Sequence, residues 1–223
     1  MTLIVVFGPD GAGKTTLSKL LIAKLRERGY DVVYLKMRVH HLFMYIILRL
    51  LQYVGAVPRS HSPRVLDFAL RRIFGKSAIY PLLETVNILI WYIIRVGLPQ
   101  VLNKTIVSDR FSPDTIVSLS IINTKLSKMI IKLLLSLCKD SYGIYVYATP
   151  DLMLNRKKDE ELSMLYLKYQ LLLYKKIIKI VSSYMKNIII INTSILTPQK
   201  AAETVLTKLL PSTQNYKLET LIL

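Results

Sequence analysis

The sequence is poor in several residue types, and each shortage excludes a class of protein. A single cysteine, Cys138, rules out an internal disulfide and a multi-cysteine zinc site. Only 8 glycines and 9 prolines occur in 223 residues, which argues against long flexible linkers. Acidic residues are scarce too, because 14 Asp and Glu stand against 31 Lys and Arg. The resulting charge of +17 attracts anions, but the lysines are dispersed along the chain, so no nucleic-acid partner is expected.

Uninterrupted apolar runs of membrane-spanning length are also missing, although 52% of the residues are hydrophobic. The apolar stretch 42–51 is broken by Arg49, and the stretch 86–94 is bounded by Glu84 and Arg95. Neither reaches the roughly 18 apolar residues that a spanning helix needs. We therefore expect a cytoplasmic protein, with peripheral membrane contact through an apolar helix as the less favoured alternative.

Short apolar segments alternate with longer segments of helical periodicity along the chain. The expected strands cover residues 3–7, 31–35, 105–108, 142–147 and 187–191. The expected helices cover residues 14–28, 116–137 with a break near Asn123, 152–184 and 198–210. Continuous apolar strands of this kind are buried on both faces, as in a parallel sheet covered by helices. The sequence thus predicts an α/β fold, built as a three-layer sandwich around a parallel sheet.

A single domain is expected over residues 1–210, with a C-terminal tail at 211–223. Residues of about 39–103 form a predicted helical insertion, interrupted near Pro58, residues 60–63, Pro81 and Pro99. The apolar helices of this insertion could bury a dimer interface as readily as a core, and we expect a homodimer.

The clearest motif follows the first expected strand. Residues 8–15 read Gly-Pro-Asp-Gly-Ala-Gly-Lys-Thr, which fits the P-loop pattern G-x-x-x-x-G-K-[ST] without a mismatch. In such a loop, backbone N–H groups and the start of the next helix hold phosphate oxygens. Lys14 should reach the β- and γ-phosphates of ATP, and the Thr15 hydroxyl should ligate Mg²⁺. The expected ATP-phosphate contacts are Gly8, Asp10, Gly11, Ala12, Gly13, Lys14, Thr15 and Thr16.

Two carboxylates and an arginine extend this site. Asp10 lies inside the loop, where a carboxylate beside bound phosphates is electrostatically costly. It either faces the hydroxyl of an acceptor or only forms a turn with Gly11. Asp109 and Arg110 end the third strand, at the edge of a parallel sheet where ligands bind. We expect Asp109 to hold Mg²⁺ and Arg110 to grip an acceptor phosphate, a surface ion pair being the alternative.

These motifs together resemble those of the thymidylate kinase family. The resemblance rests on the P-loop with its internal Asp, on Val-Ser-Asp-Arg-Phe at 107–111, and on Tyr-Ala-Thr-Pro-Asp-Leu-Met-Leu-Asn-Arg at 147–156. All three occur in the family's order and spacing, and with the strand pattern they cover most of residues 1–210. The resemblance implies a P-loop NTPase fold with strand order 2-3-1-4-5, a helical lid at about 151–165, and transfer of the γ-phosphate of ATP to dTMP.

The same resemblance implies roles for individual residues. Asp10 would touch the acceptor sugar, while Arg110 and Arg38, which follows the second strand, would bind the acceptor phosphate. The lid would close over the transferring phosphoryl group with its basic residues. The catalytic residues implied are Lys14, Asp109 and Arg156, and the metal ligands are Thr15 and Asp109.

Arg156, Lys157 and Lys158 are the basic residues of the expected lid. Because Gly11 stands where some family members place an arginine, the lid should supply the cation for the transition state, with Arg156 as the first candidate. The alternative is a solvated helical turn whose charges pair with Glu160 and Glu161.

One segment departs from the family's pattern and leaves the acceptor open. Where the family carries a polar Asp-Arg-x-Gln-like stretch, residues 87–92 read Asn-Ile-Leu-Ile-Trp-Tyr. Acceptor recognition could instead use arginines elsewhere, namely Arg64, Arg71, Arg72 or Arg95. Two alternatives therefore stand beside a dTMP kinase: a kinase of a lipid-linked, sugar or other metabolite, and a nucleotide-gated binding protein with little kinase activity.

Overall fold

The computed structural model describes residues 2–37, 49–50, 52–55, 77, 79–122, 126–157 and 163–210. Several residues named above lie outside these ranges, namely Arg38, Pro58, residues 60–63, Arg64, Arg71, Arg72, Asn123, Lys158, Glu160, Glu161 and the tail 211–223. Most of residues 39–78, the first part of the predicted insertion 39–103, also lie outside them.

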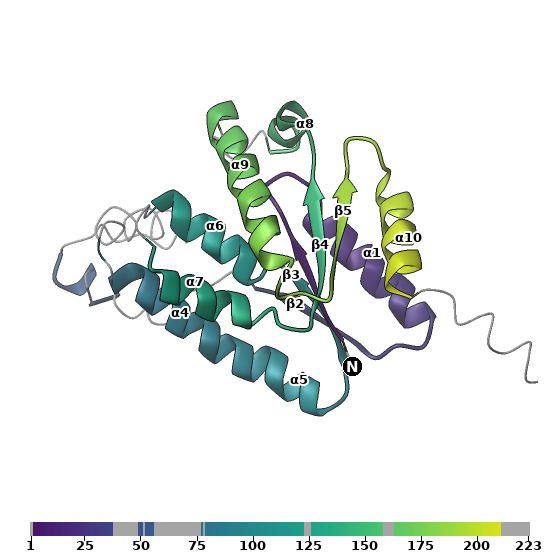
Figure 1. Ribbon diagram of the computed structural model, residues 1–223, viewed down its shortest axis with the longest axis horizontal. Helices are drawn as coiled ribbons and strands as arrows, with labels where there is room; N and C mark the ends of the chain where they lie inside the picture. The colour runs from purple at the N-terminus through teal and green to yellow at the C-terminus, as the bar shows by residue number, and fades with distance from the viewer. Residues whose placement is uncertain are drawn as a thin grey trace, which may run out of the picture.

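Five strands form a single parallel sheet (Figure 1). They are β1 (Leu3–Phe7), β2 (Val32–Lys36), β3 (Thr105–Asp109), β4 (Tyr142–Tyr147) and β5 (Asn187–Asn192). Their order is β2-β3-β1-β4-β5, and every neighbouring pair is parallel. The predicted α/β fold, the five strands and the order 2-3-1-4-5 are confirmed.

The central strand β1 is fully buried because helices cover both faces of the sheet. Alternate side chains of a strand point to opposite faces. Leu3, Val5 and Phe7 accordingly belong to one hydrophobic cluster, whereas Ile4 and Val6 belong to another. A continuous apolar run is therefore what this position in the sheet requires.

The two clusters separate the helices into two layers. Helices α1 (Lys14–Glu27) and α10 (Pro198–Leu209) pack against each other and against one face of the sheet. The other face is covered by α4 (Ile79–Tyr92), α6 (Ser112–Ile122), α7 (Lys128–Ser136) and α9 (Met164–Val181) (Figure 1). The short helix α8 (Pro150–Asn155) follows β4.

The single helix expected over 152–184 is wrong. Helix α8 ends at Asn155, and α9 begins at Met164. Ser163 provides the physical reason, because its side chain accepts a hydrogen bond of 3.1 Å from the Tyr166 N–H and caps a new helix. Similar apolar periodicity on both sides of the break concealed it in the sequence.

Pro99 does not interrupt the helix, contrary to expectation. Residues 79–101 are helical throughout, because a π-helical turn, Ile93–Gly97 (η1), joins α4 to α5 (Leu98–Val101). The N–H of Leu98 bonds the carbonyl of Ile93 in this wider turn. Proline lacks an N–H, and the changed hydrogen-bond pattern of a π turn accommodates that loss inside a helix.

The stretch Tyr80–Val101 is one continuous helix of 22 residues, long and apolar enough to cross a membrane by length and composition alone. Only 33% of its most apolar part is buried. Glu84 and Arg95 interrupt the apolar run, so a search for uninterrupted runs in the sequence missed this helix.

Candidate functional site

A glycine-rich loop, residues 8–13, joins the end of β1 to the start of α1. It packs closely on the backbone of the next strand and helix along the sheet. At Gly11 the backbone has φ of 81°, and a Cβ would lie 2.6 Å from the carbonyl oxygen of Met153. A side chain at Gly8 would likewise collide with the Val146 carbonyl. Only glycine fits at these two positions, so the path of the loop is fixed by backbone contacts.

Helix α1 presents an uncapped N-terminus at the end of this loop. Its N-cap is Gly13, which offers no side-chain hydrogen bond, and no acidic residue lies in the first turn. The first N–H groups of a helix have no intrahelical partner and carry partial positive charge. The loop and helix start therefore form a surface suited to an anion.

Lys14, the first residue of α1, folds back over the loop. Its Nζ donates to the carbonyls of Gly8 at 2.6 Å and Pro9 at 2.7 Å, and it lies 3.9 Å from Asp10 Oδ1. Burial and the nearby Arg110 guanidinium lower the pKa of Lys14 to about 8, although neighbouring carboxylates act in the opposite direction. A bound anion would stabilise the ammonium form.

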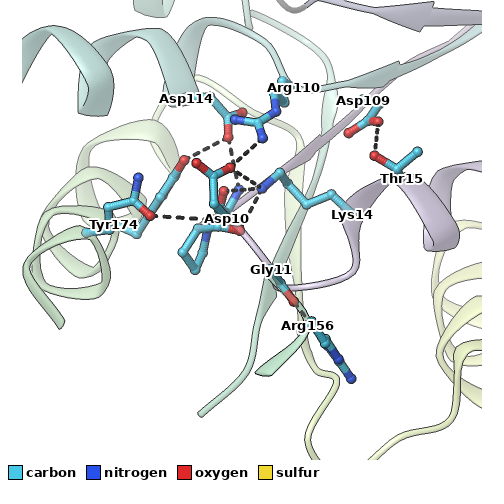
Figure 2. Close-up of polar contacts among 12 residues, drawn as sticks. Asp10, Gly11, Lys14, Thr15, Asp109, Arg110, Asp114, Arg156 and Tyr174 are labelled. Carbon is cyan, nitrogen blue, oxygen red and sulfur yellow. Dashed lines mark hydrogen bonds and ion pairs between the residues drawn. The ribbon is translucent and has the colours of Figure 1, made fainter. Parts of the chain in front are cut away.

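Asp10 and Arg110 form an ion pair beside Lys14 (Figure 2). Burial by itself raises the pKa of Asp10, but the charges of Arg110 and Lys14 outweigh it and bring the pKa to about 2. Burial lowers the pKa of Arg110, and the carboxylates of Asp10 and Asp114 more than reverse this. The loop carboxylate is therefore ionised at neutral pH and held next to an arginine from the end of β3.

The other carboxylate of the site, Asp109, ends β3 and is fully buried. Its Oδ2 accepts hydrogen bonds from the Thr15 hydroxyl at 2.6 Å and the Tyr34 hydroxyl at 3.1 Å. Its Oδ1 has no hydrogen-bond partner among the described residues. Burial and the adjacent Asp109 raise the pKa of Tyr34 to about 12, so Tyr34 remains a hydrogen-bond donor.

The sequence analysis missed Asp114, which links three parts of the site. Its Oδ1 accepts from the Gly8 N–H at 3.3 Å and the Tyr174 hydroxyl at 2.7 Å, and its Oδ2 accepts from the Phe111 N–H at 3.2 Å. Burial raises the pKa of Asp114, while Lys14 and Arg110 oppose this shift. Asp114 lies at the third helical position of α6, and its bond back to Phe111 is half of a capping box. The sequence could have revealed that local bond, but not the long-range bonds to the loop and to α9.

Gln170 of α9 was also missed, and it contacts the loop directly. Its Oε1 accepts from the Asp10 N–H at 3.3 Å, and its Nε2 donates to the Tyr166 hydroxyl at 2.9 Å. Helix α9 thus touches the site through Gln170 and through Tyr174, the second of which is labelled in Figure 2.

Arg156 lies on the side of the loop away from Lys14 and Asp10 (Figure 2). Its Nη1 donates to the Gly11 carbonyl at 3.2 Å and the Thr193 hydroxyl at 3.0 Å, and its Nη2 donates to the Thr193 carbonyl at 3.1 Å. Lys157, by contrast, is close enough to Asp10 to lower its pKa. Of the two basic residues of the expected lid that the structure describes, Arg156 is thus bonded to the loop backbone, and Lys157 acts on Asp10 through its charge.

The structure brings together five residues of the predicted set, namely Asp10, Lys14, Thr15, Asp109 and Arg110.

Other residues named from the sequence have different surroundings. Thr16 is exposed on α1, and Arg95 is exposed on η1 with its guanidinium 4.1 Å from the centre of the Trp91 ring. Asn87 is buried in α4, and its Nδ2 has no hydrogen-bond partner in the described part of the chain.

No protein-family model matches this chain, and no curated protein matches its sequence. The functional argument therefore depends on the chemistry of the residues gathered around the loop.

Proposed function

We propose that the chain is an ATP-dependent P-loop kinase that phosphorylates a nucleoside monophosphate, with dTMP as the favoured acceptor. The observation that carries the proposal is a two-sided site at the carboxyl end of the central strand. Lys14, Thr15 and the start of α1 form one side, and the Asp10–Arg110 pair forms the other. Two sides of this kind suit a triphosphate donor and a phosphorylated acceptor.

On the donor side, the loop N–H groups and Lys14 would hold the β- and γ-phosphates of ATP. Lys14 now bonds two loop carbonyls, and its ammonium would turn toward phosphate oxygens when these replace the carbonyls as acceptors. An oxygen of the acceptor phosphate attacks the γ-phosphorus, and the bond to the β,γ-bridging oxygen breaks to release ADP. The positive groups of the site stabilise the charge that shifts to that oxygen.

The same side has residues that fit Mg²⁺. The Thr15 hydroxyl and the Asp109 carboxylate are adjacent, and Asp109 Oδ1 is buried without a partner in the described residues. Hard oxygen donors of this type are the ligands that Mg²⁺ prefers. Bound Mg²⁺ supplies charge neutralisation for the phosphates in phosphoryl transfer. Thr15 and Asp109 would hold it, directly or through water, while Tyr34 keeps the carboxylate oriented.

On the acceptor side, Arg110 would bind the phosphate of the acceptor through its planar guanidinium. Asp10 now neutralises Arg110, and it would accept a hydrogen bond from the acceptor's sugar hydroxyl. Arg38, which lies outside the described residues, remains a proposed second phosphate ligand.

A kinase acting on a non-nucleotide acceptor is the second candidate, and the helix α4 favours it. The segment 87–92 forms the C-terminal part of this helix, where Ile88 is buried and Trp91 packs against the core. Apart from the buried Asn87 amide, this segment offers few hydrogen-bonding side chains for the recognition of a base.

The two candidates are separated by measuring ADP release with a panel of acceptors. We expect turnover with MgATP and dTMP that exceeds turnover with other nucleoside monophosphates, sugars and lipid-linked acceptors. Lys14→Met should abolish turnover with every acceptor, and it is the control for contaminating kinases. Turnover with a sugar or lipid-linked acceptor but not with dTMP would favour the second candidate. No turnover with any acceptor, with MgATP still bound, would favour a nucleotide-gated binding protein.

A further inference from the structure

The long helix formed by α4, η1 and α5 exposes large apolar side chains over much of its length. Those exposed to solvent, here called the apolar face, are Leu82, Val86, Ile93, Ile94, Leu98 and Val101, together with Leu102 just after the end of the helix. Val101, for example, is 81% exposed. Extended exposed apolar surface of this kind is uncommon on a free protein and marks an interaction site.

The other side of this helix belongs to the core. Tyr80, Ile88 and Val96 are buried there and pack with residues of the sheet and of α6 and α7. Passing the helix through a bilayer would remove these side chains from the core. The helix therefore suits a surface on which it can lie, not one that it must cross.

The charge around the apolar face is positive. Glu84 is the only acidic residue between positions 79 and 104, and it is 4% exposed. Arg95 is exposed among the apolar side chains, and α7, which packs against α4, carries the exposed Lys128 and Lys132 (Figure 1). An apolar helix face with an exposed arginine, on a chain of net charge +17, matches a membrane surface that contains anionic lipid.

Trp91 and Arg95 strengthen this match. The Arg95 guanidinium lies over the Trp91 ring, 4.1 Å from its centre, one helical turn away on the same side of the helix. Tryptophan is enriched at the boundary between headgroups and acyl chains, where one part of the ring is apolar and its N–H is polar. An arginine beside it can extend its head to lipid phosphate.

We propose that the apolar face docks on a membrane containing anionic lipid, with the helix lying in the plane of the headgroups. A second copy of the chain fits less well, because a two-fold interface would place this patch of each copy against the other and bury Arg95 there. The helix contributes no exposed acid to pair with that arginine. This proposal is independent of kinase activity.

The test uses Trp91, the only tryptophan in the chain, as a reporter beside the apolar face, where it is partly buried under Arg95. Full-length protein is mixed with vesicles of phosphatidylcholine alone or with phosphatidylglycerol added. We expect the Trp91 emission to shift to shorter wavelength with the anionic vesicles, and acyl-chain bromination to quench it. Added salt should weaken the response. Unchanged emission with anionic vesicles, or an equal response to neutral ones, contradicts the proposal.

Matched variants assign the binding to this face in a vesicle sedimentation assay. The pair Ile93→Asp/Val101→Asp should lower the vesicle affinity at least about tenfold, and Arg95→Gln should lower it about fivefold. Leu172→Asp, the same kind of change at an exposed position on α9, should bind like wild type. Circular dichroism shows whether each variant is folded. If the double variant Ile93→Asp/Val101→Asp does not fold, Arg95→Gln alone still tests the proposal.

Light scattering without vesicles tests whether a second copy of the chain covers the apolar face instead of a membrane. A dimer that Ile93→Asp/Val101→Asp converts to a monomer, with no vesicle binding by wild type, would show that the face pairs two copies. That outcome would overturn the membrane proposal and support the homodimer expected from the sequence.

Discussion

Lys14 lies among several charged side chains that are gathered around the glycine-rich loop. Its ammonium is buried and contacts Asp10, while Arg110 on the far side of Asp10 repels it. The cost of burying a charge and this repulsion together bring its pKa close to physiological pH. The same ammonium would gain most from a bound triphosphate, because phosphate oxygens favour its charged form.

The affinity for nucleotide should consequently fall as pH rises. Free Lys14 loses its proton as pH rises through about 8, whereas phosphate binding would raise its pKa. The Kd for MgATP should therefore increase above pH 8, by up to about tenfold per pH unit. Titration calorimetry from pH 7 to pH 9 measures this, and Lys14→Arg, which keeps its charge, should lack the trend. A Kd for wild type that stays constant over this range would rule out Lys14 as the phosphate ligand.

Asp114 is the second residue whose contacts predict a specific outcome. It accepts three hydrogen bonds, so Asp114→Ala leaves the buried Gly8 N–H and Tyr174 hydroxyl without their partner. We expect a loss of about 2–4 kcal/mol in the free energy of unfolding, measured by urea denaturation. Tyr174→Phe removes only one of the donors, and should cost about 1 kcal/mol.

Activity would show whether Asp114 also positions the loop. If its bond to Gly8 sets the loop conformation, Asp114→Ala should raise the KM for ATP at a temperature where the variant is folded. Tyr174→Phe leaves that bond intact and should change the KM less. Equal KM values for the two variants would assign Asp114 a structural role alone.

At the scale of elements, the end of α8 brings two basic residues into reach of the glycine-rich loop. Arg156 follows α8 directly and is held by Thr193 and the Gly11 carbonyl. Lys157 is one residue further, and its charge lowers the pKa of Asp10.

Kinetics of single variants separate the roles of these two residues. As the lid cation inferred from the family resemblance, Arg156 would have to leave its three hydrogen bonds, and Arg156→Ala would lower kcat far more than ATP affinity. In its present position, it instead supports the loop, and Arg156→Ala would mainly raise the KM for ATP. Lys157→Ala serves as the comparison, and we expect it to lower kcat by at least about tenfold. Unchanged kcat in both variants would exclude a lid cation at either position.

At the scale of the whole molecule, the net charge of +17 affects stability through self-repulsion. The 14 acidic residues can pair with only part of the 31 basic ones, and described pairs such as Lys24–Glu203 and Lys104–Asp31 are on the surface. Screening by salt therefore weakens more repulsion than attraction.

We expect the Tm to rise as NaCl is increased from low salt to physiological ionic strength. Sodium phosphate at equal ionic strength should raise the Tm further, because phosphate would bind the loop in the native state in addition to its general stabilising effect. Lys14→Met should reduce the additional effect of phosphate to the general part and keep the effect of NaCl. A Tm that falls with NaCl would show that favourable ion pairs outweigh the net repulsion.

The sequence by itself determined the sheet, the loop and the residues at strand ends. Continuous apolar strands identify a sheet buried on both faces, and the glycines of residues 8–13 permit a loop that no other residue type could follow. Those features are local, because strand burial, turn geometry and helix starts each depend on residues close in the chain. Asp10, Lys14, Thr15, Asp109 and Arg110 could be named from the sequence because they lie at such points.

Only the tertiary structure decided the contacts between segments distant in the chain. The bonds of Asp114 to Gly8 and Tyr174, and of Gln170 to Asp10, cross more than one element and have no local pattern. The direction of Arg156 depends on where α8 ends and on Thr193, which follows β5 and accepts its hydrogen bonds. Which side of the helix 79–101 stays exposed likewise depends on the elements that cover its other side, since apolar periodicity alone does not distinguish a core from a binding surface.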